Sequence, residues 1–243
     1  GMFKNVRPDD LLAHVLKAAV NRCPGLDLTT IDDVIVGCAM PEAEQGMNVA
    51  RIASLRAGIP VTASAVTINR FCSSGLQAIA YAAERVMCGA ADAIVAGGTE
   101  SMSLVPMGGH TVAPNPTLVD DYPDVYLSTG LVAENHAREA GVSREEQDAF
   151  ALRSHQKAVA AMDAGRFTDE IVPVTARTVD TANGHPRTGD VRFAMDEGPR
   201  RDTSMAALGT LRPAFHVRGT VTAGNSSQTS DGAAAVVVTS AAK

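Results

Sequence analysis

The chain has 243 residues, enough to bury a sizeable core and near the upper end for one domain. Hydrophobic residues make up 45% and charged residues 20%, which is typical of a globular protein. The net charge of -6 and the lack of a basic stripe with interleaved aromatics argue against nucleic-acid binding. No apolar run reaches the roughly 18 residues of a membrane span, and no signal-peptide pattern opens the chain. We therefore expect a cytoplasmic protein, or one of an organelle matrix if the source is eukaryotic.

The first part of the chain alternates helix and strand patterns. Asp9 or Asp10 can cap a first helix whose apolar residues recur at helical spacing. Further segments predict, in order, a strand at 33–38, a helix at 48–57, a strand ending at 68, a helix ending near 88 and a strand at 92–98. This alternation predicts an α/β fold with a mainly parallel sheet covered by helices on both faces.

The residue composition of the chain changes after Gly98. Residues 99–222 are rich in Pro, Gly and Asp and hold few strand signals. Their clearest helix begins at Ser143, which forms a capping box with Glu146, and runs to about Met162. The apolar run 233–239 then predicts another buried strand of the sheet. We interpret 1–98 and 223–243 as an α/β core and 99–222 as an inserted loop domain.

The rest of the chain is organised around residues 66–80, which read as a short strand, a tight polar turn and an apolar helix. The turn places Cys72 at the helix start, where unpaired N–H groups and the helix dipole stabilise a thiolate. A nucleophilic cysteine is one interpretation, and a free thiol packed as a small hydrophobe is the other. Because the four cysteines are far apart and form no C-x-x-C pair, we expect no metal site. The apolar settings of Cys38 and Cys88 predict reduced, buried thiols at these two positions.

The segment NRFCSSGLQAIA at 69–80 resembles the active-site segment of the thiolases. GGTESMS at 97–103, the helix and strand segments between 133 and 174, and TVTAGNSSQTSDGAAAVVV at 220–238 resemble further thiolase segments in the same order. The resemblance implies a layered thiolase-like fold with an inserted loop domain. It also implies that Cys72 is the nucleophile and carries the acyl group as a thioester.

The resemblance covers only the amino-terminal half of a thiolase. It implies that a first central strand and a second, similarly folded half are missing, with the catalytic histidine of a G-H-P motif and the second cysteine of a C-x-G motif. We assign no role to Gly184-His185-Pro186, which lies in a polar loop without a C-x-G partner. The 243-residue chain alone is therefore not expected to be catalytically competent.

The activity implied is that of a 3-ketoacyl-CoA thiolase in fatty acid β-oxidation, with coenzyme A as co-substrate and no tightly bound cofactor. By resemblance, Ser227 lines the pantetheine arm of CoA, although its loop alone reads as a plain turn. Arg200 is our candidate for the CoA phosphates, against the alternative that it is solvated surface. The expected partners are acyl-CoA and CoA, in a homodimer or homotetramer.

Three alternatives stay open at this point. The chain resembles degradative more than biosynthetic acetoacetyl-CoA-forming thiolases, through SSGLQAI, NSSQ and SDG. A sterol-carrier-type thiolase would be distinguished by its products. A catalytically silent acyl-CoA-binding homologue would lack the G-H-P and C-x-G motifs in its full gene. The acyl chain length and the direction of flux do not follow from these residues.

Overall fold

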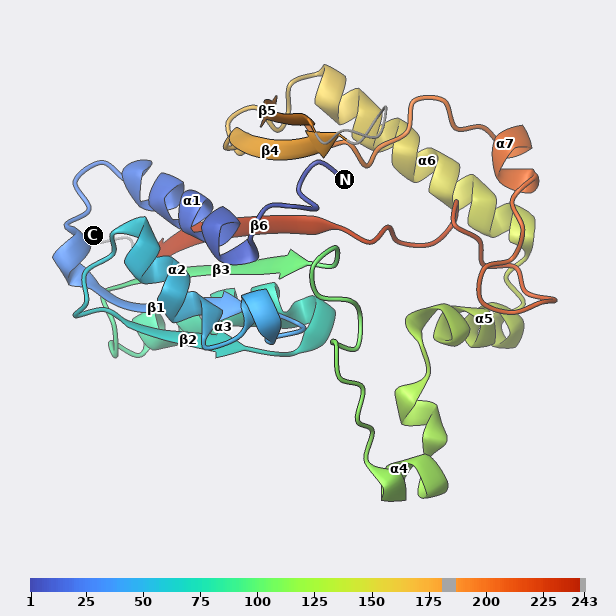
Figure 1. The fold of residues 1–243 in the computed structure, drawn as a ribbon, viewed down its shortest axis with the longest axis horizontal. Coiled ribbons are helices and arrows are strands. Elements are labelled where there is room, and N and C mark those ends of the chain that lie inside the picture. Colours follow the sequence, from blue (N-terminus) through green and yellow to red (C-terminus); the bar gives the residue numbers. More distant parts are fainter. Residues whose placement is uncertain (181–186, 241–243) are drawn as a thin grey trace. The chain divides into compact units, whose positions relative to one another are not determined.

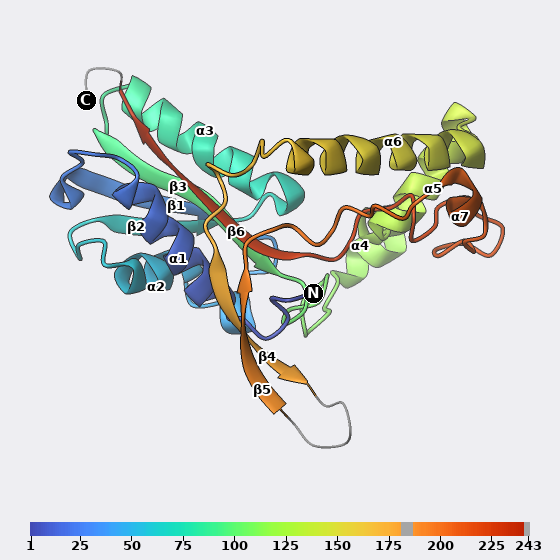
Figure 2. The same ribbon diagram turned by 90° about the horizontal axis from the view of Figure 1, so that it is seen from above.

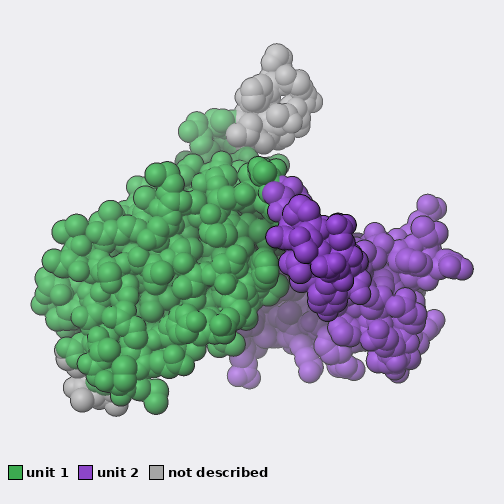
Figure 3. Space-filling view, turned by 90° about the horizontal axis from the view of Figure 1, so that it is seen from below, with its two compact units in different colours: residues 1–111, 172–194, 229–243 green, residues 112–171, 195–228 purple. Residues whose placement is uncertain are grey.

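A computed structural model of the chain describes residues 1–180 and 187–240 (Figure 1). The chain divides into two compact units, coloured separately in Figure 3. Unit 1 comprises residues 1–111, 172–194 and 229–243, and unit 2 comprises 112–171 and 195–228. In the described ranges no helix has the length and apolar character needed to cross a membrane. The domain boundaries at 98 and 223 stay a prediction.

Unit 1 is built on a four-stranded sheet with the order β2-β1-β3-β6. Its strands are β1 (Ile31–Gly37), β2 (Ser64–Ile68), β3 (Ala93–Ser101) and β6 (Asp231–Thr239). β1 runs parallel to both β2 and β3, and β6 runs antiparallel to β3 along its whole length. The mainly parallel sheet expected from the sequence is therefore confirmed, and β6 makes it a mixed sheet.

Helices cover both faces of this sheet (Figure 2). These are α1 (Pro8–Asn21) and α2 (Val49–Ala57) on one face and α3 (Ser74–Met87) on the other. Because successive strand residues point to opposite faces, Val34 and Val36 pack in the cluster with α1 and α2, whereas Ile35 packs against Ala78 and Ala82 of α3. The two clusters form the hydrophobic core of unit 1.

The start of α1 differs from the prediction. Neither Asp9 nor Asp10 is the N-cap; both lie in the first turn, after Arg7 and Pro8. The missing N–H of proline costs nothing at a helix start, so Pro8 can begin α1 without a side-chain cap. The Asp9 carboxylate instead accepts hydrogen bonds from the Arg7 guanidinium at 2.9 and 3.0 Å.

A two-stranded antiparallel sheet completes unit 1, in a region that holds few strand signals. β4 (Val174–Asp180) pairs antiparallel with β5 (Arg187–Phe193). The ring of Phe193 packs edge-on against Phe3 at 4.5 Å between centroids, and His14 Nε2 lies 3.0 Å from the Pro173 carbonyl oxygen. The two-stranded sheet is thus tied to the segment around α1 by contacts that are distant in sequence.

Unit 2 is helical. It holds α4 (Pro116–Asp121), α5 (Thr129–Ala140), α6 (Arg144–Asp163) and α7 (Met205–Gly209). The capping box predicted at the start of α6 is present, because the Ser143 side chain accepts from the Glu146 N–H while the Glu146 carboxylate accepts from the Ser143 N–H. Those hydrogen bonds to Ser143 hold the pKa of Glu146 below its usual value. The α6 boundaries match the sequence prediction closely.

The N-terminus of α3 lies against the sheet at backbone distance. A Cβ built on Gly37, the last residue of β1, would lie 2.4 Å from the Ser74 carbonyl carbon and 2.5 Å from the Gly75 nitrogen. Gly98, paired with Gly37 on β3, has the Gly75 Cα 3.7 Å from its own Cβ position. Glycines on the two strands therefore let the first turn of α3 rest directly on the sheet.

We expect Gly37→Ala to destabilise the protein by about 1–3 kcal/mol, because an added methyl group here overpacks rigid backbone. Urea unfolding of the full-length protein measures the change. Gly75→Ala is the matched control: its Cβ position has no atom within 4 Å and lies in a helix, so this variant should be as stable as the wild type or slightly more stable. Equal stability of the two variants would contradict the close approach.

Candidate active site

Cys72 lies at the edge of the sheet where the parallel strands end. β1 and β2 end at the paired residues Gly37 and Ile68, and Gly98 of β3 pairs with Gly37. The turn after β2 carries Cys72 in a 3₁₀ helix (Phe71–Ser73) that leads directly into α3. Ligand sites of open α/β sheets lie beyond the carboxyl ends of the strands. The Cys72 side chain is exposed there.

The turn that presents Cys72 is strained and held by hydrogen bonds. Phe71 has a φ of +45°, in the left-handed region that non-glycine residues rarely adopt. The Phe71 N–H donates to Asn69 Oδ1 at 2.8 Å. Ser74 accepts from the Arg70 N–H at 2.8 Å and donates to the Phe71 carbonyl at 2.6 Å. Such strain, about 1–3 kcal/mol, persists only where neighbouring contacts over-determine it, often at functional sites.

Only one face of α3 is buried in unit 1. Ser74, Ala78 and Ala82 are buried, whereas Leu76 is 71% and Met87 86% exposed. The sequence predicted a helix inside the protein, because it is apolar almost all round. The described chain covers the side toward the sheet and leaves an apolar face uncovered.

A second thiol lies near the same sheet edge but in a very different setting. Cys38 directly follows β1 and is 1% exposed. Burial, and to a lesser extent the negative charge of Glu100, raises the pKa of the Cys38 thiol to about 12. Because the thiolate is the reactive form, this cysteine is chemically inert near neutral pH.

The remaining cysteines are Cys23 and Cys88. The sequence predicted buried thiols at Cys38 and Cys88, and this is right for Cys38 and wrong for Cys88, which is exposed. Cys88 follows the last residue of α3, and its thiol lies 3.4 Å from the Arg85 carbonyl oxygen. The segment looked apolar by composition, but α3 ends at the surface of the unit.

Polar side chains around Glu100 of β3 join the loops that follow β1 and β2 at this edge. Glu100 Oε2 accepts from the Ala39 N–H at 2.6 Å, and its Oε1 accepts from the Met40 N–H at 3.3 Å and Gln45 Nε2 at 2.8 Å. Gln45 is fully buried and also donates to the Met40 carbonyl at 2.8 Å. Asn69 Nδ2 donates to the Ala39 carbonyl at 2.9 Å. Asn69 and Glu100 lie in segments that resemble thiolase segments, but the sequence alone assigned neither a role; their position at strand ends was the available signal.

Ser227 lies in unit 2, on an exposed loop held at its base by Asn225. Asn225 Oδ1 accepts from the Thr222 N–H at 2.7 Å, while its Nδ2 donates to Asp148 at 2.9 Å and to the Thr220 carbonyl at 3.1 Å. Asp148 is 2% exposed and pairs with Arg144 at 2.7 Å. The loop base is therefore fixed, and the Ser227 hydroxyl lies 3.3 Å from the Gln228 carbonyl oxygen.

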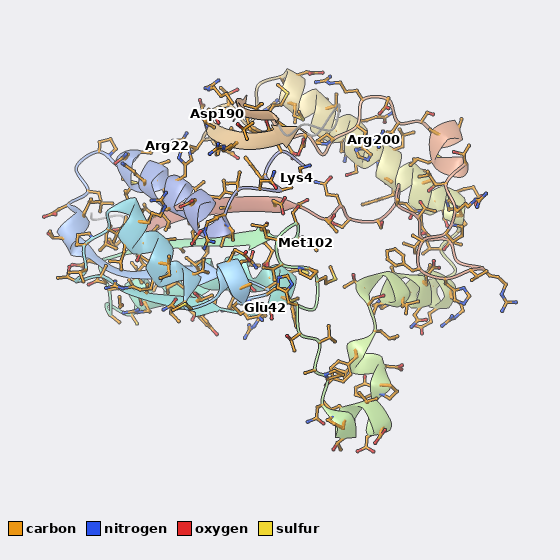
Figure 4. The ribbon with its side chains drawn as sticks, viewed as in Figure 1. Lys4, Arg22, Glu42, Met102, Asp190 and Arg200 are labelled. Carbon is orange, nitrogen blue, oxygen red and sulfur yellow. The ribbon has the colours of Figure 1, made fainter. Side chains whose placement is uncertain are left out.

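Arg200 belongs to unit 2 as well, and Figure 4 draws it beside α6. Its N–H donates to His155 Nδ1 at 3.1 Å. The guanidinium makes long contacts of 3.4 and 3.5 Å to Asp202, and this hydrogen bonding holds the pKa of Asp202 below its usual value. Arg201 instead makes a bidentate pair with Asp163, with N···O distances of 2.9 and 2.5 Å. Of the two arginines, Arg200 is the less firmly engaged.

The structure brings the segments of Ser227 and Arg200 together within unit 2, since a Cβ on Gly198 would meet the Gln228 side-chain amide at 2.5–2.9 Å. Cys72 belongs to unit 1. The Gly184-His185-Pro186 segment lies outside the described residues. Within 1–180 and 187–240, no group of three His, Cys, Asp or Glu side chains is arranged to hold a metal ion.

We expect iodoacetamide at pH 8 to alkylate the exposed Cys72 and Cys88 in the native protein but not Cys38. The raised pKa keeps the Cys38 thiol protonated up to about pH 12, and its burial blocks the reagent. Peptide mapping by mass spectrometry measures each site, and urea-unfolded protein is the control in which Cys38 should react. Native modification of Cys38 as fast as of Cys88 would contradict this setting.

Comparisons with known proteins show the family to which the chain belongs. Residues 1–242 match the family described as "Thiolase, N-terminal domain". The chain is 55% identical over 239 residues to a 3-ketoacyl-CoA thiolase of Bacillus subtilis, covering 98% of this chain and 61% of that protein. Proteins of the same name from Shewanella oneidensis and Escherichia fergusonii are each 46% identical, over 98% and 99% of this chain and 60% of theirs. The chain thus spans about 60% of the length of the curated relatives it matches. It belongs to the thiolase family and corresponds to the N-terminal domain of its members.

Proposed function

We propose that this protein is a 3-ketoacyl-CoA thiolase that cleaves its substrate through an acyl thioester on Cys72. The observation that carries the proposal is the exposed Cys72 thiol in a strained turn at the start of α3, beyond the carboxyl ends of the parallel strands. The three relatives described above, each named 3-ketoacyl-CoA thiolase, support the substrate class.

The first half-reaction transfers an acyl group to the enzyme. The Cys72 sulfur attacks the 3-keto carbon of the substrate, and negative charge develops on the keto oxygen. The bond between C2 and C3 then breaks, its electron pair goes to C2, and protonation of that carbanion releases acetyl-CoA. Backbone N–H groups of the 3₁₀ helix and of the first turn of α3, including that of Cys72, are suited to stabilise the oxyanion.

The second half-reaction returns the enzyme to its starting state. The thiolate of free CoA attacks the thioester carbonyl, the bond to the Cys72 sulfur breaks, and an acyl-CoA shortened by two carbons leaves. This order predicts ping-pong kinetics. A base must take the proton of Cys72, and another group must exchange a proton with the acetyl carbanion. We assign both roles to residues outside the present 243, so we expect these residues alone to be inactive.

We assign CoA contacts to unit 2. Ser227, on a loop with an anchored base, offers a hydroxyl to the amide-bearing pantetheine arm. Arg200, which is only loosely paired with Asp202, offers a guanidinium to the phosphates of CoA. Coenzyme A is a co-substrate in this scheme, and no tightly bound cofactor takes part.

The same proposal includes a biological setting. We place the enzyme in fatty acid β-oxidation, in the cytoplasm, as a homodimer or homotetramer; its relatives named 3-ketoacyl-CoA thiolase are bacterial. The uncovered apolar face of α3, with Leu76 and Met87, favours a larger folded assembly around unit 1.

The covalent step is tested by mass spectrometry of the full-length protein after brief exposure to acetoacetyl-CoA or a longer 3-ketoacyl-CoA. We expect an acyl adduct on the Cys72 peptide that disappears when CoA is added, because CoA is the second nucleophile. Cys72→Ser should give no adduct, whereas Cys88→Ser, which removes the other exposed thiol, should acylate normally. Intact CoA binding without any adduct would instead indicate a silent acyl-CoA-binding homologue.

The phosphate contact is tested by comparing two neighbouring arginines. Arg200→Ala should raise the KM for CoA about fivefold with kcat nearly unchanged, since a charge-assisted contact made equally throughout the reaction is lost. Arg201→Ala is the matched control, because its guanidinium is already occupied by Asp163. Steady-state kinetics in CoA measures both. Equal effects of the two substitutions would contradict the assignment of Arg200.

A further inference from the structure

We propose that Glu100 is a positioning residue for the nucleophile, and that it acts through Ala39 and Asn69 on the turn that carries Cys72. The inference rests on the proposed function, because it concerns the rate at which Cys72 is acylated. Glu100 does not touch the thiol of Cys72; it holds the loop after β1, and that loop holds the turn after β2.

The first link is the carboxylate of Glu100 on the loop after β1. Its two oxygens accept from the Ala39 N–H, the Met40 N–H and the Gln45 side-chain amide, and the Cys38 thiol lies 3.9 Å away. All of these partners are donors. A carboxylate is the side-chain group that can only accept, and it can do so at both oxygens. The loop is thus bound to β3 by charge-assisted hydrogen bonds.

The second link is the Asn69 side chain. Its Nδ2 donates to the Ala39 carbonyl at 2.9 Å, and its Oδ1 accepts from the Phe71 N–H at 2.8 Å. Ala39 is thereby held from both sides, with its N–H on Glu100 and its carbonyl on Asn69. The hydrogen bond to the Phe71 N–H favours the left-handed φ of +45° at that residue, next to Cys72.

The consequence for catalysis is geometric. We call the chain of hydrogen bonds from Glu100 through Ala39 and Asn69 to the Phe71 N–H the tether. If the tether is released, Phe71 can relax from its strained conformation, and the position of the adjacent Cys72 sulfur relative to the start of α3 changes. Misplacement of a reacting group by about 1 Å can cost about a hundredfold in rate. Acylation of Cys72 should therefore slow, while substrate binding, which Glu100 does not contact in this scheme, should change little.

The experiment uses rapid-quench kinetics of the full-length protein with acetoacetyl-CoA, recording both the rate and the amplitude of acyl-enzyme formation. In Glu100→Gln an amide NH₂ replaces one acceptor oxygen and faces N–H donors. We expect acylation to slow by about tenfold to hundredfold, with an amplitude near that of the wild type. A purely structural role would lower the amplitude, through loss of folded molecules, and leave the rate per acylated molecule unchanged.

Two further variants make the test specific. Asn69→Ala removes the second link and should slow acylation to a similar extent. Because Asn69 is exposed, this variant should fold, and it tests the proposal even if Glu100→Gln does not fold. The double variant should be no slower than the slower single variant, because both residues act through one chain of hydrogen bonds. Asp33→Asn is the matched control: it alters a buried carboxylate at the start of β1, paired with Arg85, far along the strand from Gly37.

The outcomes separate the two proposals. If the wild-type protein shows no acyl burst, the proposed function is overturned. In that case the rate at which iodoacetamide alkylates Cys72 is compared between the wild type and the same variants. An unchanged alkylation rate would overturn the role of Glu100 as a positioning residue. With a wild-type burst, the tether is overturned if Glu100→Gln and Asn69→Ala acylate within twofold of the wild type, if Asp33→Asn slows acylation equally, or if the effects of the two single substitutions multiply.

Discussion

The close approach between the first turn of α3 and the ends of β1 and β3 is the constraint on which the rest of unit 1 depends. Gly37 and Gly98 leave no side chain between strand and helix, so the backbone of Ser74 and Gly75 rests on the sheet itself. This contact sets the depth at which α3 begins, and with it the place of the preceding turn. Ala78 and Ala82 continue the same seam farther along, as small residues packed against Ile35 and Ile94. Small side chains and rigid backbone leave little room for adjustment, which suits a site that must hold one reactive atom in place.

Two cysteines at neighbouring strand ends illustrate how environment decides chemistry. Cys38 follows β1 and is enclosed, with a carboxylate close by, so that its pKa is raised and its thiol stays protonated. Cys72 follows β2 by a few residues and is exposed at a helix start. The loop of Cys38 nevertheless serves the turn of Cys72, because its backbone carries the hydrogen bonds that join Glu100 to Asn69. A buried, inert thiol and an exposed, candidate nucleophile therefore belong to one polar arrangement.

In unit 2, buried polar groups likewise hold a candidate site residue in place. The loop that carries Ser227 contains glycine, asparagine and serine, a composition that is typical of flexible loops. Its base, however, is fixed by buried polar groups. Asp148 is nearly inaccessible and is satisfied by both Arg144 and Asn225. The Glu134 carboxylate accepts from the N–H groups of Thr220 and Val221 at 2.9–3.1 Å. A buried, ion-paired carboxylate such as Asp148 is costly to disturb, because removal of Arg144 would leave its charge uncompensated.

The sequence by itself determined the order of helices and strands in residues 1–98, the helix α6 and the last strand β6. Helical periodicity, the Ser143 capping box, the apolar strand runs and the strand-turn-helix around Cys72 are local patterns, and local patterns can be read from neighbouring residues. The family also followed from the sequence, because its motifs are contiguous. Tertiary structure alone decided that Glu100, Gln45 and Asn69 meet around Ala39, since these residues are 24–55 positions apart and only the parallel register of β1, β2 and β3 brings their ends together. It also decided which cysteine is buried: Cys38 and Cys88 both follow apolar segments, but one ends a central strand and the other ends a helix at the surface.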